Sequence, residues 1–210
     1  MPLEGPSTLG EGRLGLQTEL GATSLLFSPD VVHWSGRVTR PIDVSTDVAV
    51  EGSVARVGDG DSDWRSSAHR GLYALRAGVR HSPLRHVVIG GGLGGGGHAG
   101  GGFVSPDLHV TVGYHNRWLV PFLSVDAFYS HPVGVGHVVF FREGESERLR
   151  PPATGGGRIT PALRLPLAHE AEGTGPALLV GYAWHVLAVR KPSPEVYIAN
   201  GLSAGFAWTF

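Results

Sequence analysis

Acidic and basic side chains recur at alternate positions along this chain, and their spacing favours ion pairing. Asp47 and Glu51 lie four residues apart in one segment, and Arg76 and Arg80 lie four residues apart in another. Side chains at every second position of a β-strand point to the same face. A buried charge is very costly unless it is paired, so interleaved acids and bases on one face predict a salt-bridged network. The predicted members are Arg13, Glu19, Arg37, Asp43, Asp47, Glu51, Arg76, Arg80, Asp107, Asp126, Arg158 and Arg164.

Other residue types that carry chemistry form weaker patterns. The eleven histidines are scattered and cysteine is absent, so we predict no metal site and no cofactor. The run 90–102 has glycine spacing similar to a phosphate-binding loop, but no helix pattern follows it. A glycine-lined β-hairpin is the better interpretation of that run. His33 and Ser35 stand two residues apart, so on one strand face a histidine base could touch a serine nucleophile.

The elements that must position these side chains are β-strands. In the last sixteen residues, 195–210, every second residue back from Phe210 to Leu202 is apolar or aromatic, and the residues between are small or polar. Strict alternation of this kind is typical of a strand whose two faces meet different environments. The same pattern predicts ten strands and no helix, at 12–26, 31–40, 43–57, 71–81, 85–95, 103–115, 118–131, 157–167, 175–189 and 195–210.

Length and composition indicate one all-β domain. Residues 1–11 are rich in Gly, Pro, Ser and Glu and are predicted to form a flexible leader, and 12–210 form a single barrel domain. The formal net charge of −1 provides no basic surface for nucleic acid. No apolar run approaches about 18 residues, so no transmembrane helix is predicted. The printed chain has no secretory signal peptide pattern, and for an exported protein we expect that this signal has been removed.

The predicted connections alternate in length, as they do in an antiparallel up-and-down β-barrel. With both termini on the periplasmic side, the long connections face outward. The outer set comprises 27–30, 58–70, 96–101, 132–156 and 190–194, and the inner set comprises 41–42, 82–84, 115–117 and 168–174. The segment 132–156 is predicted to be the longest irregular one. If the first two strands are misassigned, the barrel has eight strands instead of ten.

The polar rows favour a membrane barrel over a soluble β-sandwich, which stays open as the alternative. The outer rows of a soluble sandwich should carry Lys, Glu and Thr, whereas the polar rows here hold Gly, Ala, Ser and few charges. Tyr and Trp collect at membrane–water interfaces. The aromatic residues predicted to form such a girdle are Tyr114, Trp118, Tyr129, Tyr182, Trp184, Trp208 and Phe210.

With its strand alternation and its terminal Phe210, the chain resembles the small OmpA/OmpX-like class of outer-membrane β-barrels over nearly its whole length. In such barrels the closing strand with its terminal Phe is the assembly signal. The resemblance implies residence in the outer membrane, contact with its lipid and lipopolysaccharide, and recognition of the C-terminal strand by the barrel assembly machinery.

Two families of barrel enzymes are similar to this chain only in general architecture. Omptin proteases have ten strands with paired Asp and an adjacent His-Asp, and this chain has no Asp-Asp and no His-Asp dipeptide. Lipid A deacylase barrels carry His-x-Ser-Asn, and here Gly36 replaces the Asn after His33-Trp34-Ser35. By the alternation, His33 and Ser35 also face the lumen, away from lipid. We therefore predict a protein that is not an enzyme, with a lipid hydrolase as the minor alternative.

The sequence is compatible with two non-enzymatic functions. The first is a structural or interaction barrel (an anchor, an adhesin or a complex subunit), whose ion pairs close the lumen and whose loops 58–70 and 132–156 face partners. Within the second loop, the acid- and base-rich segment 141–152 is the predicted contact surface for a partner protein. The alternative is a narrow passive channel whose lumenal charges select small solutes or ions.

Overall fold

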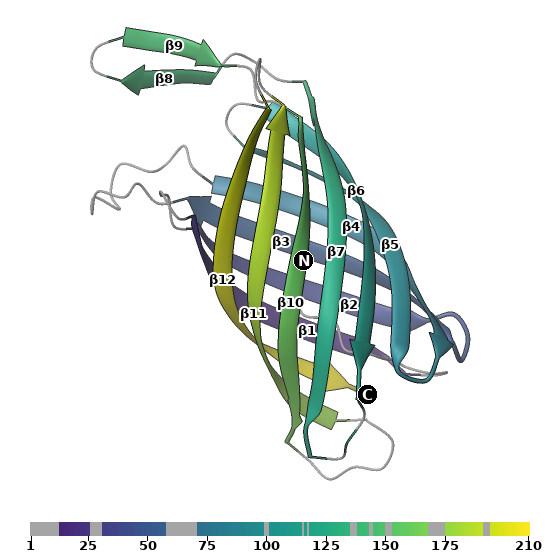
Figure 1. The fold of residues 1–210 in the computed structure, drawn as a ribbon. Helices are drawn as coiled ribbons and strands as arrows, with labels where there is room; N and C mark the ends of the chain where they lie inside the picture. Colours follow the sequence, from purple (N-terminus) through teal and green to yellow (C-terminus); the bar gives the residue numbers. More distant parts are fainter. Residues whose placement is uncertain are drawn as a thin grey trace.

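Ten strands in the described part of the chain close into one antiparallel barrel (Figure 1). The computed structural model describes residues 13–25, 31–57, 71–98, 101–114, 116, 118–134, 138–142, 145–149, 153–167, 175–190 and 194–210. No helix in these ranges is long and apolar enough to cross a membrane. The barrel strands are β1 (Gly15–Leu25), β2 (Val31–Pro41), β3 (Thr46–Val57), β4 (Gly71–Leu84), β5 (Val87–His98), β6 (Gly101–Gly113), β7 (Val120–Val133), β10 (Thr154–Pro166), β11 (Gly175–Arg190) and β12 (Pro194–Thr209).

The predicted ten-stranded, up-and-down topology is confirmed. Each barrel strand pairs with its neighbours along the chain, and β1 pairs with β12 to close the sheet. At the seam, the backbone N–H of Phe210 donates to the carbonyl of Leu14 at 2.9 Å, and the N–H of Leu14 donates to the carbonyl of Phe210 at 3.3 Å. Closure leaves no unpaired sheet edge, which is the condition for placing strands in hydrocarbon.

The two ends of the barrel differ in their connections. At one end of the barrel β1 begins and β12 ends, and we call it the terminal end. Its connections include the short turns 42–45 and 85–86. At the first of these, the N–H of Ile42 donates to the carbonyl of Thr46 at 2.8 Å. The opposite end, which we call the loop end, carries the connections 58–70 and 134–153. This division follows the predicted alternation of inner turns and outer loops.

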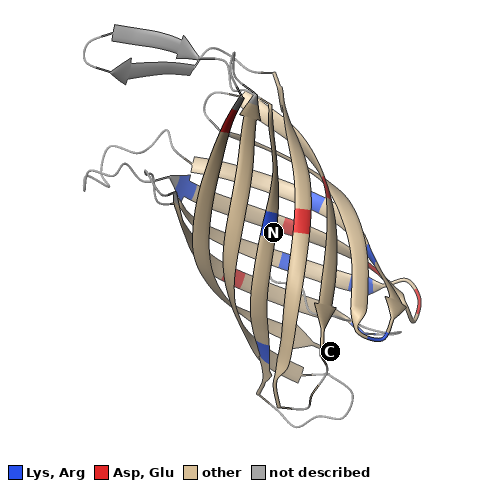
Figure 2. Ribbon diagram, viewed as in Figure 1, with Lys and Arg blue, Asp and Glu red and all other residues tan. Residues whose placement is uncertain are grey.

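Each barrel strand has one exposed, mostly apolar face and one face turned to the lumen, which is polar on most strands and largely apolar on β11, where Ala177 and Leu179 are buried. In β6, Leu108 and Val110 are 69% and 43% exposed. The residues that alternate with them, Asp107 and His109, are 8% and 3% exposed. The apolar face points outward because the barrel wall is a single sheet with its other face turned to the lumen. Figure 2 marks the charged positions on the barrel strands. The outward apolar belt is thus continuous around a charged interior.

Two parts of the chain differ from the prediction. The segment 132–156, predicted to be irregular, contains β8 (Val138–Arg142) and β9 (Glu145–Leu149), which pair with each other in a separate two-stranded sheet. The glycine hairpin predicted at 90–102 is present. However, β5 continues to His98 and β6 begins at Gly101, so most of the expected loop 96–101 is strand. Glycines on both strands allow the hairpin to continue to its tip. The predicted leader 1–11 and the loop 58–70 lie outside the described residues.

Candidate functional site in the barrel lumen

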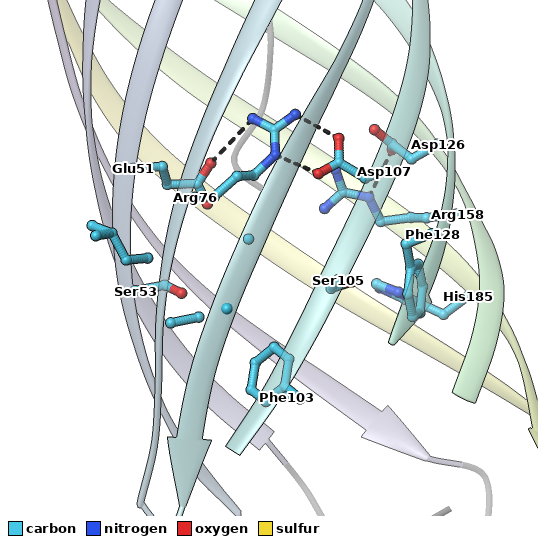
Figure 3. A pocket seen from close by; sticks show the side chains of 14 residues that line it. Glu51, Ser53, Arg76, Phe103, Ser105, Asp107, Asp126, Phe128, Arg158 and His185 are labelled. Atoms are coloured by element: carbon cyan, nitrogen blue, oxygen red, sulfur yellow. Dashed lines mark hydrogen bonds and ion pairs between the residues drawn. The ribbon is translucent and has the colours of Figure 1, made fainter. Parts of the chain in front are cut away.

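Arg76 of β4 is the centre of the lumenal charge network (Figure 3). Its Nε and Nη2 donate to the two carboxylate oxygens of Asp107 on β6, each at 2.6 Å. Its Nη1 lies 4.0 Å from Oε2 of Glu51 on β3. The same Oε2 accepts a hydrogen bond of 3.0 Å from Nη2 of Arg37 on β2. A chain of ion pairs therefore runs from β2 to β6. Its bidentate pair, Arg76 with Asp107, connects β4 to β6, which are not neighbours in the sheet.

Strand β5 lies between Arg76 and Asp107, and its glycines make their pairing possible. Gly94 is the register partner of Arg76, and Gly92 is the register partner of Asp107. A Cβ at Gly92 would stand 2.8 Å from Nε and from Cζ of Arg76. The guanidinium therefore lies directly over Gly92, and a side chain at that position would displace it.

Three further lumenal pairs join neighbouring strands. Asp47 and Arg80 are register partners on β3 and β4, and Nη2 of Arg80 donates to Oδ2 of Asp47 at 2.6 Å. Asp126 and Arg158 are register partners on β7 and β10, with Nε of Arg158 donating to Oδ2 at 2.9 Å. On β1 and β2, Oε1 of Glu19 lies 3.8 Å from Nε2 of His33. Ion pairs of this kind offset the desolvation cost of the buried charges.

On the wall formed by β7, β10, β11 and β12, the terminal half of the lumen contains packed apolar side chains. Phe122, Ala162 and Leu179 form a buried apolar cluster with Ala207 packed against it, and we call these four residues the terminal plug. Beside the plug, the hydroxyls of Thr111 and Ser124 form a buried hydrogen bond of 2.7 Å. These residues lie within a few positions of the terminal ends of their strands. The terminal end of the lumen therefore holds a buried apolar cluster in addition to ion pairs.

The loop-end half of the lumen contains two cavities, each of about 220 Å³. The first lies against Phe103 and Phe128 and is floored by the pairs of Arg76 and Arg158 (Figure 3). The second lies against β1, β2, β10, β11 and β12. Glu51, Ser53, Arg158 and His185 line both cavities, so the two are adjacent.

Most of the residues predicted for the charge network face the lumen, and Asp43 does not. Arg164 faces the lumen on the same row as Thr160 and Ala162, and it is half-buried. Asp43 was predicted to be lumenal, but it lies exposed in the turn before β3, where its Oδ1 accepts hydrogen bonds from Ser45. Arg13, also predicted in a strand, precedes β1 and is half-exposed. The correction of Asp43 comes from a strand that begins later than the alternation suggested.

His33 and Ser35 both face the lumen, as the alternation predicted. Ser35 Oγ is buried, and no side chain or backbone group in the described residues hydrogen-bonds to it. A serine nucleophile needs a base within hydrogen-bond reach, and His33 does not fill that role here. The sequence prediction missed the terminal plug and the role of Gly92. The inward position of Phe122 was the available signal for the plug.

The residues predicted for the aromatic girdle are all exposed on the outer face of the barrel. Trp118, Trp208 and Phe210 lie at the terminal end with Tyr114, and the rings of Trp208 and Phe210 stack with centroids 5.5 Å apart. Tyr129 lies toward the loop end of β7. Tyr182 and Trp184 lie in the middle of β11, away from either end, so they do not belong to a ring at the barrel rim.

No protein-family model matches the chain, and no curated protein matches it in sequence. Among solved structures, it is similar to Neisserial surface protein A, with 9% identity, 94% of this chain and 96% of that chain covered, and a TM-score of 0.47. It is also similar to an outer membrane channel from Pseudomonas putida, with 10% identity, 100% of both chains covered and a TM-score of 0.48. The β domain of the Bordetella autotransporter BrkA gives 9% identity, 93% and 98% coverage, and a TM-score of 0.49.

The architecture of the chain rests on its own strand pairing and burial. The sheet is closed, its outer face is an exposed apolar belt, and its charges are buried inside. A soluble sandwich would bury the apolar face instead, because its sheets pack face to face through it. An exposed apolar belt around a closed barrel is stable in contact with the hydrocarbon of a lipid bilayer and not in contact with water. The chain is therefore a transmembrane β-barrel of the outer-membrane type.

Proposed function

We propose that this protein is a structural or interaction barrel, which anchors its loops at the membrane surface and does not conduct solutes. The observation that carries the proposal is the terminal plug, in which Phe122 and Leu179 are 5% and 2% exposed. A conducting pore needs a continuous polar path. Buried apolar side chains from four neighbouring strands make one side of the terminal end unfavourable for such a path.

The ion pairs support the same function. Asp47 is fully buried against Arg80, and Asp107 is held by two short hydrogen bonds from Arg76. Charges that are bound to one another are not available to replace the hydration shell of a passing ion. Small barrels are commonly filled by their own side chains in this way. The network and the plug together make the barrel a rigid support.

The proposed contact surface is the set of connections at the loop end. The connection 58–70 lies outside the described residues, and the connection 132–156 contains β8 and β9. With the terminal end toward the periplasm, these connections face outward, and a partner protein would meet the segment 141–152 there. Lipid and lipopolysaccharide would contact the apolar belt, and the assembly machinery would recognise β12.

The second candidate function is a narrow passive channel, and the two lumenal cavities favour it. They shorten the obstructed part of the lumen to its terminal half. A movement of the plug would then suffice to open a path between the two ends. The charges that such a path meets would select its solutes.

Planar-bilayer conductance of the refolded protein separates the two functions. For an anchor, the wild-type protein gives no conductance steps, and the double variant Phe122→Ala/Leu179→Ala gives them because it removes the plug. The variant Val125→Ala, which changes an exposed residue of β7, serves as the control and stays silent. Steps in the wild-type protein that change in Arg76→Ala or Arg80→Ala would contradict the anchor and support the channel.

A further inference from the structure

A row of small side chains leaves space in the loop-end half of the lumen. Gly94 on β5 is the register partner of Ser105 on β6. Beside them, Ala74 on β4 is the register partner of Ser53 on β3. All four residues line the first cavity. The side chains of a small barrel normally fill its interior, and here they are too short to do so. The hollow of about 220 Å³ therefore follows from the residues that these four strands place on one row.

Two phenylalanine rings form one wall of this hollow. Phe103 and Phe128 are half-buried, and they line the cavity from β6 and β7 (Figure 3). A Cβ at Gly96 would stand 2.9 Å from Cε1 of Phe103. Likewise, a Cβ at Gly156 would stand 2.9 Å from Cζ of Phe128. Each ring therefore lies against a glycine of a neighbouring strand, and part of its surface faces the cavity. Such surface favours contact with an apolar or aromatic ligand group over contact with water.

A hydroxyl group lies beside both rings. Ser105 is two residues from Phe103 on the same face of β6. Phe128 on β7 is the register partner of Asp107, which is the next residue along that face. Ser105 and Phe128 are therefore diagonal neighbours on adjacent strands, which brings them to within about 7–8 Å. A serine hydroxyl both donates and accepts hydrogen bonds. It is thus placed to bind the polar group of a ligand whose ring contacts the two phenylalanines.

The charged residues of the cavity lining are bound to one another. The three carboxylates of the described lining each accept a hydrogen bond from a different guanidinium, at 3.0, 2.6 and 2.9 Å. These pairs are Arg37 with Glu51, Arg76 with Asp107, and Arg158 with Asp126. The six charges cancel. A charged ligand would lose its hydration without gaining an unpaired countercharge, so the cavity favours an uncharged one.

We propose that the first cavity binds a small uncharged aromatic molecule that carries one hydroxyl group. The ring contacts Phe103 and Phe128, and the hydroxyl hydrogen-bonds to Ser105. The cavity is smaller than the about 300–1,000 Å³ of sites for drug-sized ligands, so its ligand has a single ring. The proposal goes beyond anchoring, and it does not depend on whether the lumen conducts, because the terminal plug lies on the other side of the charge network.

The ligand class is tested by calorimetric titration of the refolded protein in detergent micelles, with empty micelles as the blank. The probes are 2-phenylethanol, 2-phenylethylammonium and 3-phenylpropanoate, which share a phenyl ring and differ mainly in the charge of the polar group. We expect 2-phenylethanol to bind saturably and at least about tenfold more tightly than either charged probe. No saturable heat above the micelle blank for 2-phenylethanol, or equal or tighter binding of a charged probe, would overturn the proposal.

The location of the site is tested by filling the cavity. Gly94 lines it, and a Cβ there would meet its neighbours only at 3.4 Å and beyond, so Gly94→Val is expected to fold. The matched control is Gly52→Val, because Gly52 lies on the outward row of β3 and its Cβ would meet nothing within 4 Å. We expect Gly94→Val to weaken 2-phenylethanol binding at least about tenfold and the control to change it less than about twofold. Equal weakening in the control would overturn the assignment, because binding would then not depend on the lumen.

A second filling variant, Ala74→Leu, keeps the test decisive if Gly94→Val does not fold. Folding of each variant is checked by heat-modifiable migration in detergent gels. Wild-type affinity for 2-phenylethanol in a folded Gly94→Val or Ala74→Leu protein would overturn the assignment of the cavity.

The hydrogen bond to Ser105 is tested by a change that hardly alters the shape of the cavity. Ser105→Ala removes one uncharged hydrogen bond, so it should weaken 2-phenylethanol binding about fivefold. Ethylbenzene has the same ring and no hydroxyl, so its binding should change less than about twofold in this variant. Equal affinity of 2-phenylethanol for the wild-type protein and for Ser105→Ala would overturn the assignment of the hydroxyl.

Discussion

Arg76 and Asp107 form a bidentate ion pair across a strand that separates them, with the guanidinium lying over Gly92. The pair ties β4 to β6 without passing through the hydrogen-bond ladder of β5. This relationship depends equally on two charges and on one missing side chain. The charges and the glycine can therefore be tested separately.

A side chain at Gly92 should destabilise the barrel. In Gly92→Val the new Cβ stands 2.8 Å from Arg76 and 2.8 Å from the backbone carbonyl oxygen of Ala77, so the guanidinium leaves Asp107 and the wall distorts, and overpacking of this kind costs about 1–3 kcal/mol. Urea titration in lipid vesicles measures the free energy of unfolding. Gly52→Val is the matched control, since nothing lies within 4 Å of its Cβ. Equal stability of the two variants would show that Arg76 does not need the space over Gly92.

Removing both members of the Arg76–Asp107 pair should cost less than the sum of the two single removals. In Asp107→Leu the buried Arg76 loses its bidentate partner, and breaking a buried pair in this way costs about 3–5 kcal/mol. In Arg76→Met/Asp107→Leu no charge of the pair remains, so the loss should be smaller than the sum of the two single variants by about 0.5–3 kcal/mol. The same urea titration completes the double-mutant cycle. Simple additivity would mean that the two groups do not stabilise each other.

An arginine on the outer face should be costly in the middle of a strand and tolerated at its end. Leu108 is 69% exposed near the middle of β6, and Val133 is 41% exposed at the loop end of β7. In hydrocarbon, Leu108→Arg should cost about 2–4 kcal/mol and Val133→Arg about 0–1 kcal/mol. In water, both changes would stay within about 0.5 kcal/mol. Unfolding titrations in vesicles would refute the membrane assignment if Leu108→Arg cost no more than Val133→Arg.

Asp43 should contribute stability that disappears in acid. Hydrogen bonds to its carboxylate from the backbone N–H of Ser45, and then from the Ser45 hydroxyl, hold the pKa of Asp43 below its ordinary value. Because the pKa is lower in the folded state, the contribution is complete above the unfolded pKa and is lost as the pH falls through the folded pKa. Asp43→Asn keeps an acceptor oxygen but loses the charge. The difference in urea midpoint between wild type and variant should be largest near neutral pH, and a difference that persists undiminished at the most acidic pH would contradict this.

The two roles of Phe210 can be separated. Its backbone closes the barrel by hydrogen bonds with Leu14, and its ring stacks on Trp208. Deletion of Phe210 removes both sets of contacts and should slow spontaneous folding into vesicles, whereas Phe210→Ala keeps the backbone bonds and should change the rate little. If the ring is the assembly signal, both variants should fold poorly with the assembly machinery present. Normal assisted folding of Phe210→Ala would exclude that signal.

The period-two pattern was enough to predict the ten barrel strands and their faces, but not β8 and β9. It placed Asp107 and His109 inside and Leu108 outside, because alternation has a physical origin in the pleat. It could not predict where strands begin. The pattern continues through Asp43 and Ser45, but these two residues form a local hydrogen-bonded turn that competes with the strand.

The partners within the lumen could not be predicted from the sequence. Pairing of Asp47 with Arg80 requires the register of two strands, and pairing of Arg76 with Asp107 requires the registers of three. Register depends on hydrogen bonding between segments, which a single-strand pattern does not contain. For the same reason the sequence predicted a glycine-lined hairpin at 90–102, but it did not show that Gly92 leaves space for the guanidinium of Arg76.

The glycine row of β5 has a consequence for how this barrel can vary among relatives. Gly92 lies beneath Arg76, and Gly90 lies beneath the imidazole of His109. A bulkier residue at either position needs the group above it to be shortened, and it also needs a shift of the neighbouring backbone, because the new Cβ would stand 2.8 Å from the carbonyl oxygen of Ala77 or of Val79. Substitutions at Gly92 should therefore co-occur with small residues in place of Arg76, and those at Gly90 with small residues in place of His109, so that the pairs co-evolve across strands.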